Sequence, residues 1–293
     1  MESKVNKYSK QLIIINSIFI IFWLTISVFP FLWTLWGSLK VKADFFSRAD
    51  WYYAISGFNT LIETGRNFTL NGYLESWTEG EFGRAALNTI IVTISVVSIS
   101  LFLGTLGAYA LSRSTYKYTF WILIAALIFR AMPHITLVSG YLFPFFQFGV
   151  WGILPTTIIV LVAINQPFTL WLLYSFFKTV PKELDESALI DGCSYFQAFR
   201  FIIMPVMWPG VITAGLFSLM LAYNDFTVTA LLLNQENYTM VPKINAYLGT
   251  VEYGGNYMWA VASVVSATAP LFMIVMFFQR QLISGLTAGA VKG

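Results

Sequence analysis

Ala85–Leu111, with the sequence AALNTIIVTISVVSISLFLGTLGAYAL, decides the fold of this chain. The stretch contains no Asp, Glu, Lys or Arg. It is longer than the roughly 20 apolar residues that a helix needs to cross the hydrocarbon core of a bilayer. It is also too long and too continuously apolar for a membrane barrel strand, which has about 9–11 residues of alternating character. We therefore predict a membrane-spanning α-helix.

Five further stretches share this character: Leu12–Trp36, Tyr118–Tyr141, Trp151–Phe177, Met207–Leu233 and Tyr257–Phe278. Of the 293 residues, 57% are hydrophobic and 11% charged, whereas soluble domains carry about 25% charged residues. The first run, about 25 residues long, exceeds the roughly 7–15 of a signal peptide, so we interpret it as a retained span. Prolines in or beside the spans are tolerated in helix bundles. The sequence predicts an all-α membrane protein with six transmembrane helices.

The short loops predict the orientation, because cytoplasmic loops carry an excess of Lys and Arg. With the N-terminus inside, ten of the 17 basic residues face the cytoplasm: Lys4, Lys7, Lys10, Arg113, Lys117, Lys178, Lys182, Arg200, Arg280 and Lys292. Both termini are then cytoplasmic. The basic residues are scattered, which excludes a nucleic-acid surface.

Loop lengths divide the chain into three parts. Residues 1–84 hold the first span and a long external segment rich in Trp and Tyr. Residues 85–284 form a five-helix core, which includes a cytoplasmic loop at 179–206 between the fourth and fifth spans. Residues 285–293 form a cytoplasmic tail.

The cytoplasmic loop predicts two short helices that meet at a corner. Gly192 is placed to end the first helix in a left-handed conformation. Ser194 and Gln197 have the spacing of a capping box that opens the second helix. Pro205 and Pro209 are expected to stop that helix before the fifth span. The pair either joins two spans or docks onto a soluble cytoplasmic partner.

One motif in this loop resembles a known family. Glu186-Ser187-Ala188 is followed after three residues by Gly192 and after nine more by Ile202-Ile203-Met204-Pro205. The pattern is similar to the EAA loop of ABC importer permeases, which reads E-A-A, x3, G, x9, I-x-L-P. Ser187 and Met204 are the two departures, and both are conservative.

The resemblance extends over roughly Phe68 to Gly293. FTLNGY (Phe68–Tyr73) and the end GLTAGAVKG (Gly285–Gly293) resemble elements of the maltose-type (MalG-like) permeases of binding-protein-dependent carbohydrate importers. This resemblance implies a multi-pass protein of a prokaryotic cytoplasmic (inner) membrane. It also implies a heterodimer with a second permease, a cytoplasmic ABC ATPase homodimer and an extracytoplasmic solute-binding protein.

The same resemblance implies that the chain is no enzyme and binds no cofactor, because ATP and Mg bind to the partner ATPase. The sequence agrees, since it has no G-x-x-x-x-G-K-[ST] phosphate loop. The solute class implied is a di- or oligosaccharide, a polyol or a glycerol phosphate.

Three groups of site residues follow from the resemblance. The EAA loop would couple to the ATPase through Glu186, Ser187, Ala188, Asp191, Gly192, Phe196, Phe199 and Pro205. The tail would reach the ATPase through Gly285, Thr287, Gly289 and Lys292, although a glycine-rich end is also typical of disorder. The Asn234–Asn256 loop would face the binding protein with Tyr238, Tyr247, Tyr253 and Asn256, which interfacial packing explains about as well.

Polar residues inside the spans are candidates for a translocation path, because buried ionisable groups in membranes are expensive. These residues are Arg130, Asn165, Gln166, Asn224 and Asp225. In the alternative interpretation, Arg130 and Asp225 neutralise each other and hold the bundle together. His134, next to Pro133, is interpreted as a hydrogen-bonded packing residue rather than a proton relay.

Two other functions remain open from the residues. A self-sufficient secondary transporter or channel would show internal repeats over more spans, and none is clear here. A membrane-embedded enzyme would need a reactive cluster. The single histidine, His134, and the single cysteine, Cys193, lie on different segments.

Overall fold

The computed structural model describes residues 2–40, 69–249 and 256–290. The chain divides into two compact units. Unit 1 comprises Met1–Glu81 and Ala246–Ala269, and unit 2 comprises Phe82–Asn245 and Pro270–Gly293.

Helices dominate the described residues, as the sequence predicts. Five helices are long and apolar enough to cross a membrane: Leu12–Ser38 within α1 (Glu2–Ser38), α4 (Phe82–Arg113), α7 (Leu154–Phe177), Tyr195–Tyr223, and Tyr257–Gln281 within α13 (Tyr257–Ala290). A sixth crossing exists if α5 (Tyr118–Ala131) and α6 (His134–Gln147), a bent pair, count as one span. The all-α membrane fold is therefore confirmed. The side of the membrane that each terminus faces stays a prediction.

The third predicted span, Tyr118–Tyr141, is broken rather than straight. α5 ends at Ala131, and α6 begins at His134 with a bend of 84° between the two helices. Met132 has an extended backbone with ψ of 144°, which is the conformation that a residue before proline prefers. Pro133 therefore marks a sharp bend within the third predicted span.

The fifth predicted span, Met207–Leu233, differs at both ends. α9 (Tyr195–Ala198), a π-helix (Phe199–Ile203) and α10 (Met204–Tyr223) form one helical run. The expectation that Pro205 and Pro209 stop this helix is wrong. Pro205 lies in the first turn of α10, directly after the π-helix, and such local π adjustments re-satisfy backbone groups freed by proline in membrane helices. At the far end, α10 stops at Tyr223 and α11 (Thr227–Leu232) begins after a short break.

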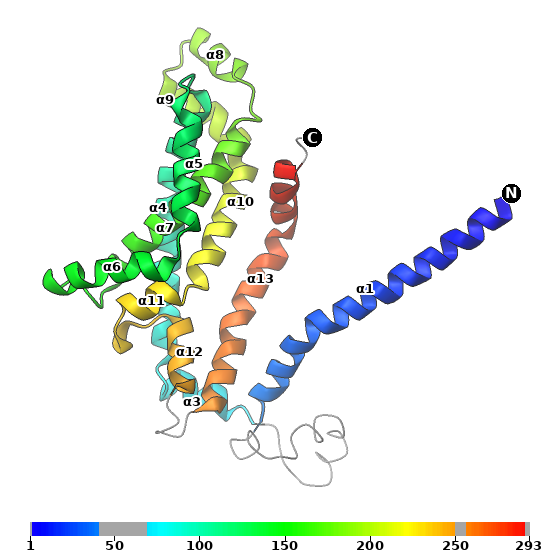
Figure 1. Cartoon of the computed structure of the whole chain (residues 1–293), viewed down its shortest axis with the longest axis vertical. Helices are drawn as coiled ribbons and strands as arrows, with labels where there is room; N and C mark the ends of the chain where they lie inside the picture. The colour runs from blue at the N-terminus through cyan, green and yellow to red at the C-terminus, as the bar shows by residue number, and fades with distance from the viewer. Residues whose placement is uncertain (1, 41–68, 250–255, 291–293) are drawn as a thin grey trace. The chain divides into compact units, whose positions relative to one another are not determined.

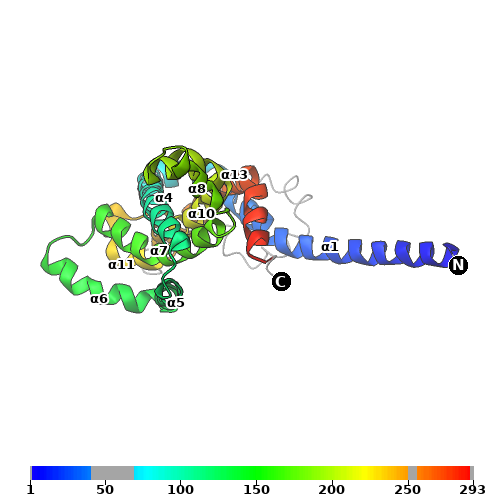
Figure 2. The same cartoon turned by 90° about the horizontal axis from the view of Figure 1, so that it is seen from above.

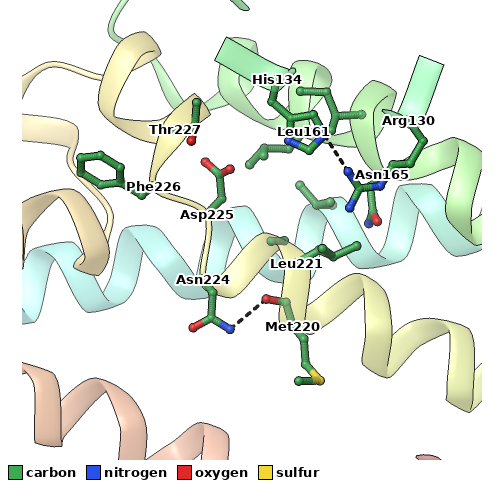
Figure 3. Close-up of a pocket in the computed structure, with 13 residues that line it drawn as sticks. Arg130, His134, Leu161, Asn165, Met220, Leu221, Asn224, Asp225, Phe226 and Thr227 are labelled. Carbon is green, nitrogen blue, oxygen red and sulfur yellow. Dashed lines mark hydrogen bonds between the residues drawn. The ribbon is translucent and has the colours of Figure 1, made fainter. Parts of the chain in front are cut away.

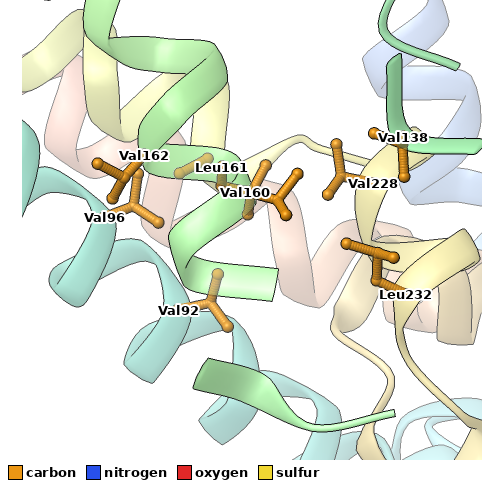
Figure 4. Packing of buried hydrophobic residues seen from close by; sticks show 9 residues of the cluster. Val92, Val96, Val138, Val160, Leu161, Val162, Val228 and Leu232 are labelled. Carbon is orange, nitrogen blue, oxygen red and sulfur yellow. The ribbon is translucent and has the colours of Figure 1, made fainter. Parts of the chain in front are cut away.

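Unit 2 is built around α4, α7 and α10, with α5 and α6 to one side of them (Figures 1 and 2). Two apolar clusters form its core. The first gathers Val92, Val96, Val138, Val160, Leu161, Val162, Ala222, Val228 and Leu232 from α4, α6, α7, α10 and α11 (Figure 4). The second gathers Ala108, Leu172, Leu173, Phe177, Val180, Ile203, Met207, Val211 and Ala214. α8 (Glu183–Ile190) and α9 lie at one end of the bundle (Figure 1).

Glycines allow the helices of unit 2 to approach closely. A Cβ atom at Gly104 of α4 would lie 3.0 Å from Thr169 and 3.2 Å from Leu173, both on α7. A Cβ atom at Gly210 of α10 would lie 2.8 Å from the Cγ of Phe176, also on α7. α7 is thus the central helix against which α4 and α10 pack, and small residues at such contacts are typical of membrane helices.

Unit 1 holds the described part of α1, the short helix α3 (Asn71–Thr78) and the first half of α13. The hydroxyl groups of Ser38 and Tyr73 are 2.6 Å apart, which ties α1 to α3. The indole of Trp259 donates to Glu75 at 2.9 Å, which ties α3 to α13. The apolar side chains of α1 from Leu12 to Leu35 are exposed, as expected of a helix that contacts lipid.

The glycine contact between α10 and α7 makes a prediction about stability. We expect Gly210→Ala to destabilise the protein by about 1–3 kcal/mol, because the new methyl group overpacks a site next to the stiff part of Phe176. Gly140→Ala on α6 is the matched control, since its Cβ meets nothing within 4 Å and alanine favours a helix. Thermal unfolding in detergent measures both, and equal midpoints for the two variants would contradict the packing argument.

Candidate functional site

The two helix breaks of unit 2 meet at one pocket. The α5–α6 break at Met132–Pro133 and the α10–α11 break at Asn224–Phe226 both border it (Figure 3). Its volume is about 320 Å³, and it is lined by Val96, Arg130, His134, Leu161, Ile164, Asn165, Met220, Leu221, Ala222, Asn224, Asp225, Phe226 and Thr227. Irregular backbone at membrane depth is tolerated where it is buried in protein or lines a cavity. The breaks therefore mark this pocket as a candidate site.

Arg130 and His134 face each other across the α5–α6 break. Nη1 of Arg130 lies 2.6 Å from Nε2 of His134. A guanidinium can only donate hydrogen bonds, so Nε2 accepts, and the imidazole proton of the neutral ring sits on Nδ1. Both side chains line the pocket, and the guanidinium of Arg130 has further N–H groups that can donate. His134 is hydrogen-bonded, as predicted, and it also lines the pocket wall.

Asp225 caps a helix instead of neutralising Arg130. Its Oδ1 accepts hydrogen bonds from the backbone N–H groups of Val228 at 3.0 Å and Thr229 at 2.9 Å, in the first turn of α11. Within the described part of the chain, no ion pair joins Asp225 to Arg130. The alternative in which these two residues neutralise each other is therefore not observed. Asn224 is likewise engaged locally, since its Nδ2 donates to the carbonyl of Met220 at 2.9 Å.

Asn165 has an unpartnered acceptor in the pocket wall. The residue is 4% exposed, and its Nδ2 donates to the hydroxyl of Ser218. Its Oδ1 is buried and finds no hydrogen-bond partner among the described residues. Leaving a buried acceptor unsatisfied is costly. The oxygen is therefore suited to receive a hydrogen bond from a hydroxyl group of a solute.

Gln166 is the one predicted path residue that the pocket does not include. Its Nε2 lies instead beside Gly104, where α7 packs on α4. Gln166 therefore lies at the contact between α7 and α4, whereas Asn165 lines the pocket. The pocket thus brings together Arg130, Asn165, Asn224 and Asp225.

The loop between α7 and α10 presents an exposed corner. Gly192 has φ of +87°, and Ser194 and Gln197 form the predicted capping box, with bonds of 2.7 and 3.3 Å. Both local predictions, the left-handed glycine and the capping box, are confirmed. Nothing lies within 4 Å of a Cβ at Gly192, so its backbone conformation, and not crowding, requires glycine there.

The residues expected to couple to a partner differ in their exposure to solvent. Glu186, Ser187, Asp191, Gly192, Phe196 and Pro205 are exposed, whereas Ala188 is buried and Phe199 is half-buried. The aromatic ring of Phe199 packs on Tyr109 of α4 at 4.9 Å. Ile190 and Tyr195 were not predicted, yet they are 86% and 73% exposed beside Phe196. The sequence feature that could have identified these two residues is their position on either side of Gly192.

The residues of this chain that are predicted to face the binding protein have different surroundings in the structure. Tyr247 lies on α12 (Met240–Leu248), and its hydroxyl donates to the carbonyl of Gly80 at 2.5 Å, within unit 1. Burial, followed by the negative charge of Glu81, raises the pKa of the Tyr247 phenol above its usual value. Asn256 is half-buried. In unit 2, the carbonyl of Tyr238 accepts from Asn88 at 3.2 Å. Tyr253 lies outside the described residues.

The tail prediction concerns the end of α13. This helix continues through Gly285, Thr287 and Gly289 to Ala290, and Lys292 lies outside the described residues. Over the described ranges, no group of three or more His, Cys, Asp and Glu residues could hold a metal ion.

Comparisons with known proteins agree with this architecture. The family model described as "Binding-protein-dependent transport system inner membrane component" matches residues 100–287. The chain is 32% identical to the trehalose/maltose transport system permease protein of Thermococcus litoralis, with 92% of each chain covered. It is 26% identical to the diacetylchitobiose uptake system permease protein NgcG of Streptomyces coelicolor, over 95% of this chain and 88% of that one.

A solved structure has the same fold. It belongs to a bacterial ABC transporter involved in the import of the acidic polysaccharide alginate, and it superposes with a TM-score of 0.70 at 18% sequence identity. The likeness covers 91% of this chain and 95% of that chain.

The family model covers more than half of the chain, and the Thermococcus relative matches over nearly its whole length. Transport systems of this family work with a separate ATPase and a binding protein. Membership of the family therefore excludes the alternative that this chain is a self-sufficient secondary transporter or channel. The chain belongs to the family of binding-protein-dependent ABC transporter permeases, which are multi-pass inner-membrane proteins and not enzymes.

Proposed function

We propose that this permease forms one half of the translocation path of an ATP-driven carbohydrate importer. The other half is a second, different permease, and the energy comes from a homodimeric cytoplasmic ATPase that binds the ATP and Mg. An extracytoplasmic binding protein delivers the solute to the external loops, including Tyr238, Tyr247, Tyr253 and Asn256. The permease itself binds no cofactor. The carbohydrate class rests on the relatives, which are named for diacetylchitobiose and for trehalose and maltose.

The observation that carries the proposal is the exposed corner between α8 and α9. Ile190, Tyr195 and Phe196 are all exposed there, and so are Glu186 and Asp191. Apolar side chains gathered with a charge at one end of a bundle are typical of a docking surface. We assign this surface, hereafter the α8–α9 docking face, to the ATPase. The C-terminal residues Gly285, Thr287, Gly289 and Lys292 are assigned to the same partner.

The solute path is assigned to the pocket at the two helix breaks. Arg130 supplies hydrogen-bond donors, and the Oδ1 atom of Asn165 supplies a buried acceptor without a partner. Asn224 and Asp225 add polar atoms at the rim. Hydroxyl groups both donate and accept, so this combination suits a sugar. The second permease would close the open side of the pocket.

A charge reversal tests the docking face. The resemblance to EAA loops implies that Glu186 pairs with a basic group on the ATPase. We therefore expect Glu186→Arg to reduce the amount of ATPase that co-purifies with the permease by about tenfold or more, because like charges across an interface cost several kcal/mol. The measurement is a detergent pull-down from native membranes, with the ATPase quantified by mass spectrometry. Glu236→Arg is the control, since Glu236 is also exposed but lies on the loop between α11 and α12. An unchanged ATPase yield with Glu186→Arg would exclude this face as the docking site.

A neighbouring pair of alanine substitutions tests the pocket. We expect Asn165→Ala to lower the rate of solute uptake about tenfold, since a lost buried hydrogen bond is worth roughly 1–3 kcal/mol. Gln166→Ala is the matched control, because Gln166 lies next in sequence and outside the pocket. Uptake by cells is measured together with the amount of assembled complex. If the Gln166 variant loses uptake and the Asn165 variant keeps it, the path does not follow this pocket.

A further inference from the structure

A buried ionic cluster lies behind the α8–α9 docking face, away from the pocket. Asp185 of α8 is 9% exposed. Its Oδ2 lies 2.8 Å from Nε of Arg113, and its Oδ1 accepts a hydrogen bond of 2.5 Å from the hydroxyl of Tyr109. Arg113 and Tyr109 both belong to α4. Both oxygens of this one carboxylate are therefore held by the end of a membrane-spanning helix.

The same arginine also binds the end of α7. Nη1 of Arg113 donates to the carbonyl oxygens of Phe177 at 3.2 Å and Val180 at 3.1 Å. Carbonyl groups at the end of a helix have no partner within that helix, and a guanidinium can serve several acceptors at once because its donors form a rigid fork. Arg113 thus joins three elements, namely α4, α7 and α8.

Tyr109 extends the cluster to the π-helix. Its ring lies 5.7 Å from that of Phe177 and 4.9 Å from that of Phe199. Phe199 begins the π-helix that leads into α10. The inner side of the corner is thereby fixed to α4, α7 and α10, whereas Glu186 and Phe196 remain exposed on its outer side.

A buried ion pair is an unusual way to hold α8 against the membrane helices. Removing two charges from water costs several kcal/mol per ion, and apolar side chains of similar volume often hold a buried site as well or better. What the cluster adds is direction, since the ion pair with Arg113 and the hydrogen bond from Tyr109 together fix the orientation of α8 relative to α4. A docking face that transmits a push needs such a fixed orientation.

We propose that Asp185, Arg113 and Tyr109, hereafter the Asp185 anchor, are positioning residues that transmit movement of the ATPase from α8 to the membrane helices. The proposal rests on the α8–α9 docking face being the ATPase site. The anchor acts after docking: it does not bind the ATPase, and it makes the docked α8 move together with α4 and α7.

A labelling experiment on the whole complex tests the anchor without knowledge of the solute. The complex is purified with its ATPase, Cys193 is replaced by serine, and a reporter cysteine is introduced by Asn224→Cys at the pocket rim. The rate of labelling with N-ethylmaleimide is measured with and without trapping by ATP and vanadate. We expect the ratio of the two rates to fall to about one in Asp185→Asn and in Tyr109→Phe.

The supporting measurements separate transmission from folding and docking. ATPase co-purification and ATP hydrolysis should remain close to those of the parent complex in both variants. The thermal midpoint should do so in Tyr109→Phe, whereas Asp185→Asn is expected to lower it because Arg113 loses its charge partner. Glu183→Gln, which removes a carboxylate from an exposed position of the same helix, should keep the parent ratio. If Asp185→Asn does not accumulate, Tyr109→Phe carries the test, because it removes a single hydroxyl group and keeps the ring.

The outcomes distinguish the anchor from the proposed function. If the parent complex shows no nucleotide-dependent labelling, or if Glu186→Arg retains the ATPase, the proposed coupling fails. If the parent ratio is large and both anchor variants keep it, the anchor is overturned while the docking face stands. If the ratio of labelling rates falls to about one while ATP hydrolysis and ATPase docking are intact, the anchor is supported. If the double variant has the same ratio as either single variant, Asp185 and Tyr109 act through the same interaction.

Discussion

The membrane-spanning part of this chain depends on one constraint, which is that backbone polar groups in hydrocarbon must find partners within the protein. Unbroken helices meet this constraint by themselves. Where α10 ends and α11 begins, the carboxylate of Asp225 receives two free N–H groups instead. Where α5 ends, Pro133 has no N–H group to satisfy. At both breaks the number of N–H groups left without a partner is thus reduced, and the two breaks border the same pocket.

Local chemistry in the sequence was sufficient for much of the fold. Continuous apolar runs located the spans because the bilayer imposes a length, independent of which helices become neighbours. The corner at Gly192 and the capping box of Ser194 and Gln197 were predictable because each involves residues only a few positions apart. Such features require no knowledge of the rest of the chain.

Features that depend on distant neighbours could not be predicted. The sequence treats Asn165 and Gln166 alike, and only the packing of α7 against Gly104 shows which of them faces a cavity. In the sequence, Pro205 predicts the end of a helix. In the structure, the π-helix before it continues directly into α10. From the sequence, Arg113 is identified only as one of the basic residues on the cytoplasmic side of the membrane. Its role with Asp185 depends on the end of α4 lying beside the first turn of α8.

The pocket and the Asp185 anchor lie on the same two helices. α4 carries Val96 in the pocket wall and Arg113 in the anchor, and α7 carries Asn165 in the wall and Phe177 at the anchor. From Asn165 to Phe177, α7 rises by about 18 Å at ~1.5 Å per residue. α4 packs tightly on α7 at Gly104, between these ends. Two helices in close contact transmit a displacement better than either alone, because close-packed interiors are hardly compressible. A movement imposed on α8 would therefore reach the pocket through a short and stiff connection.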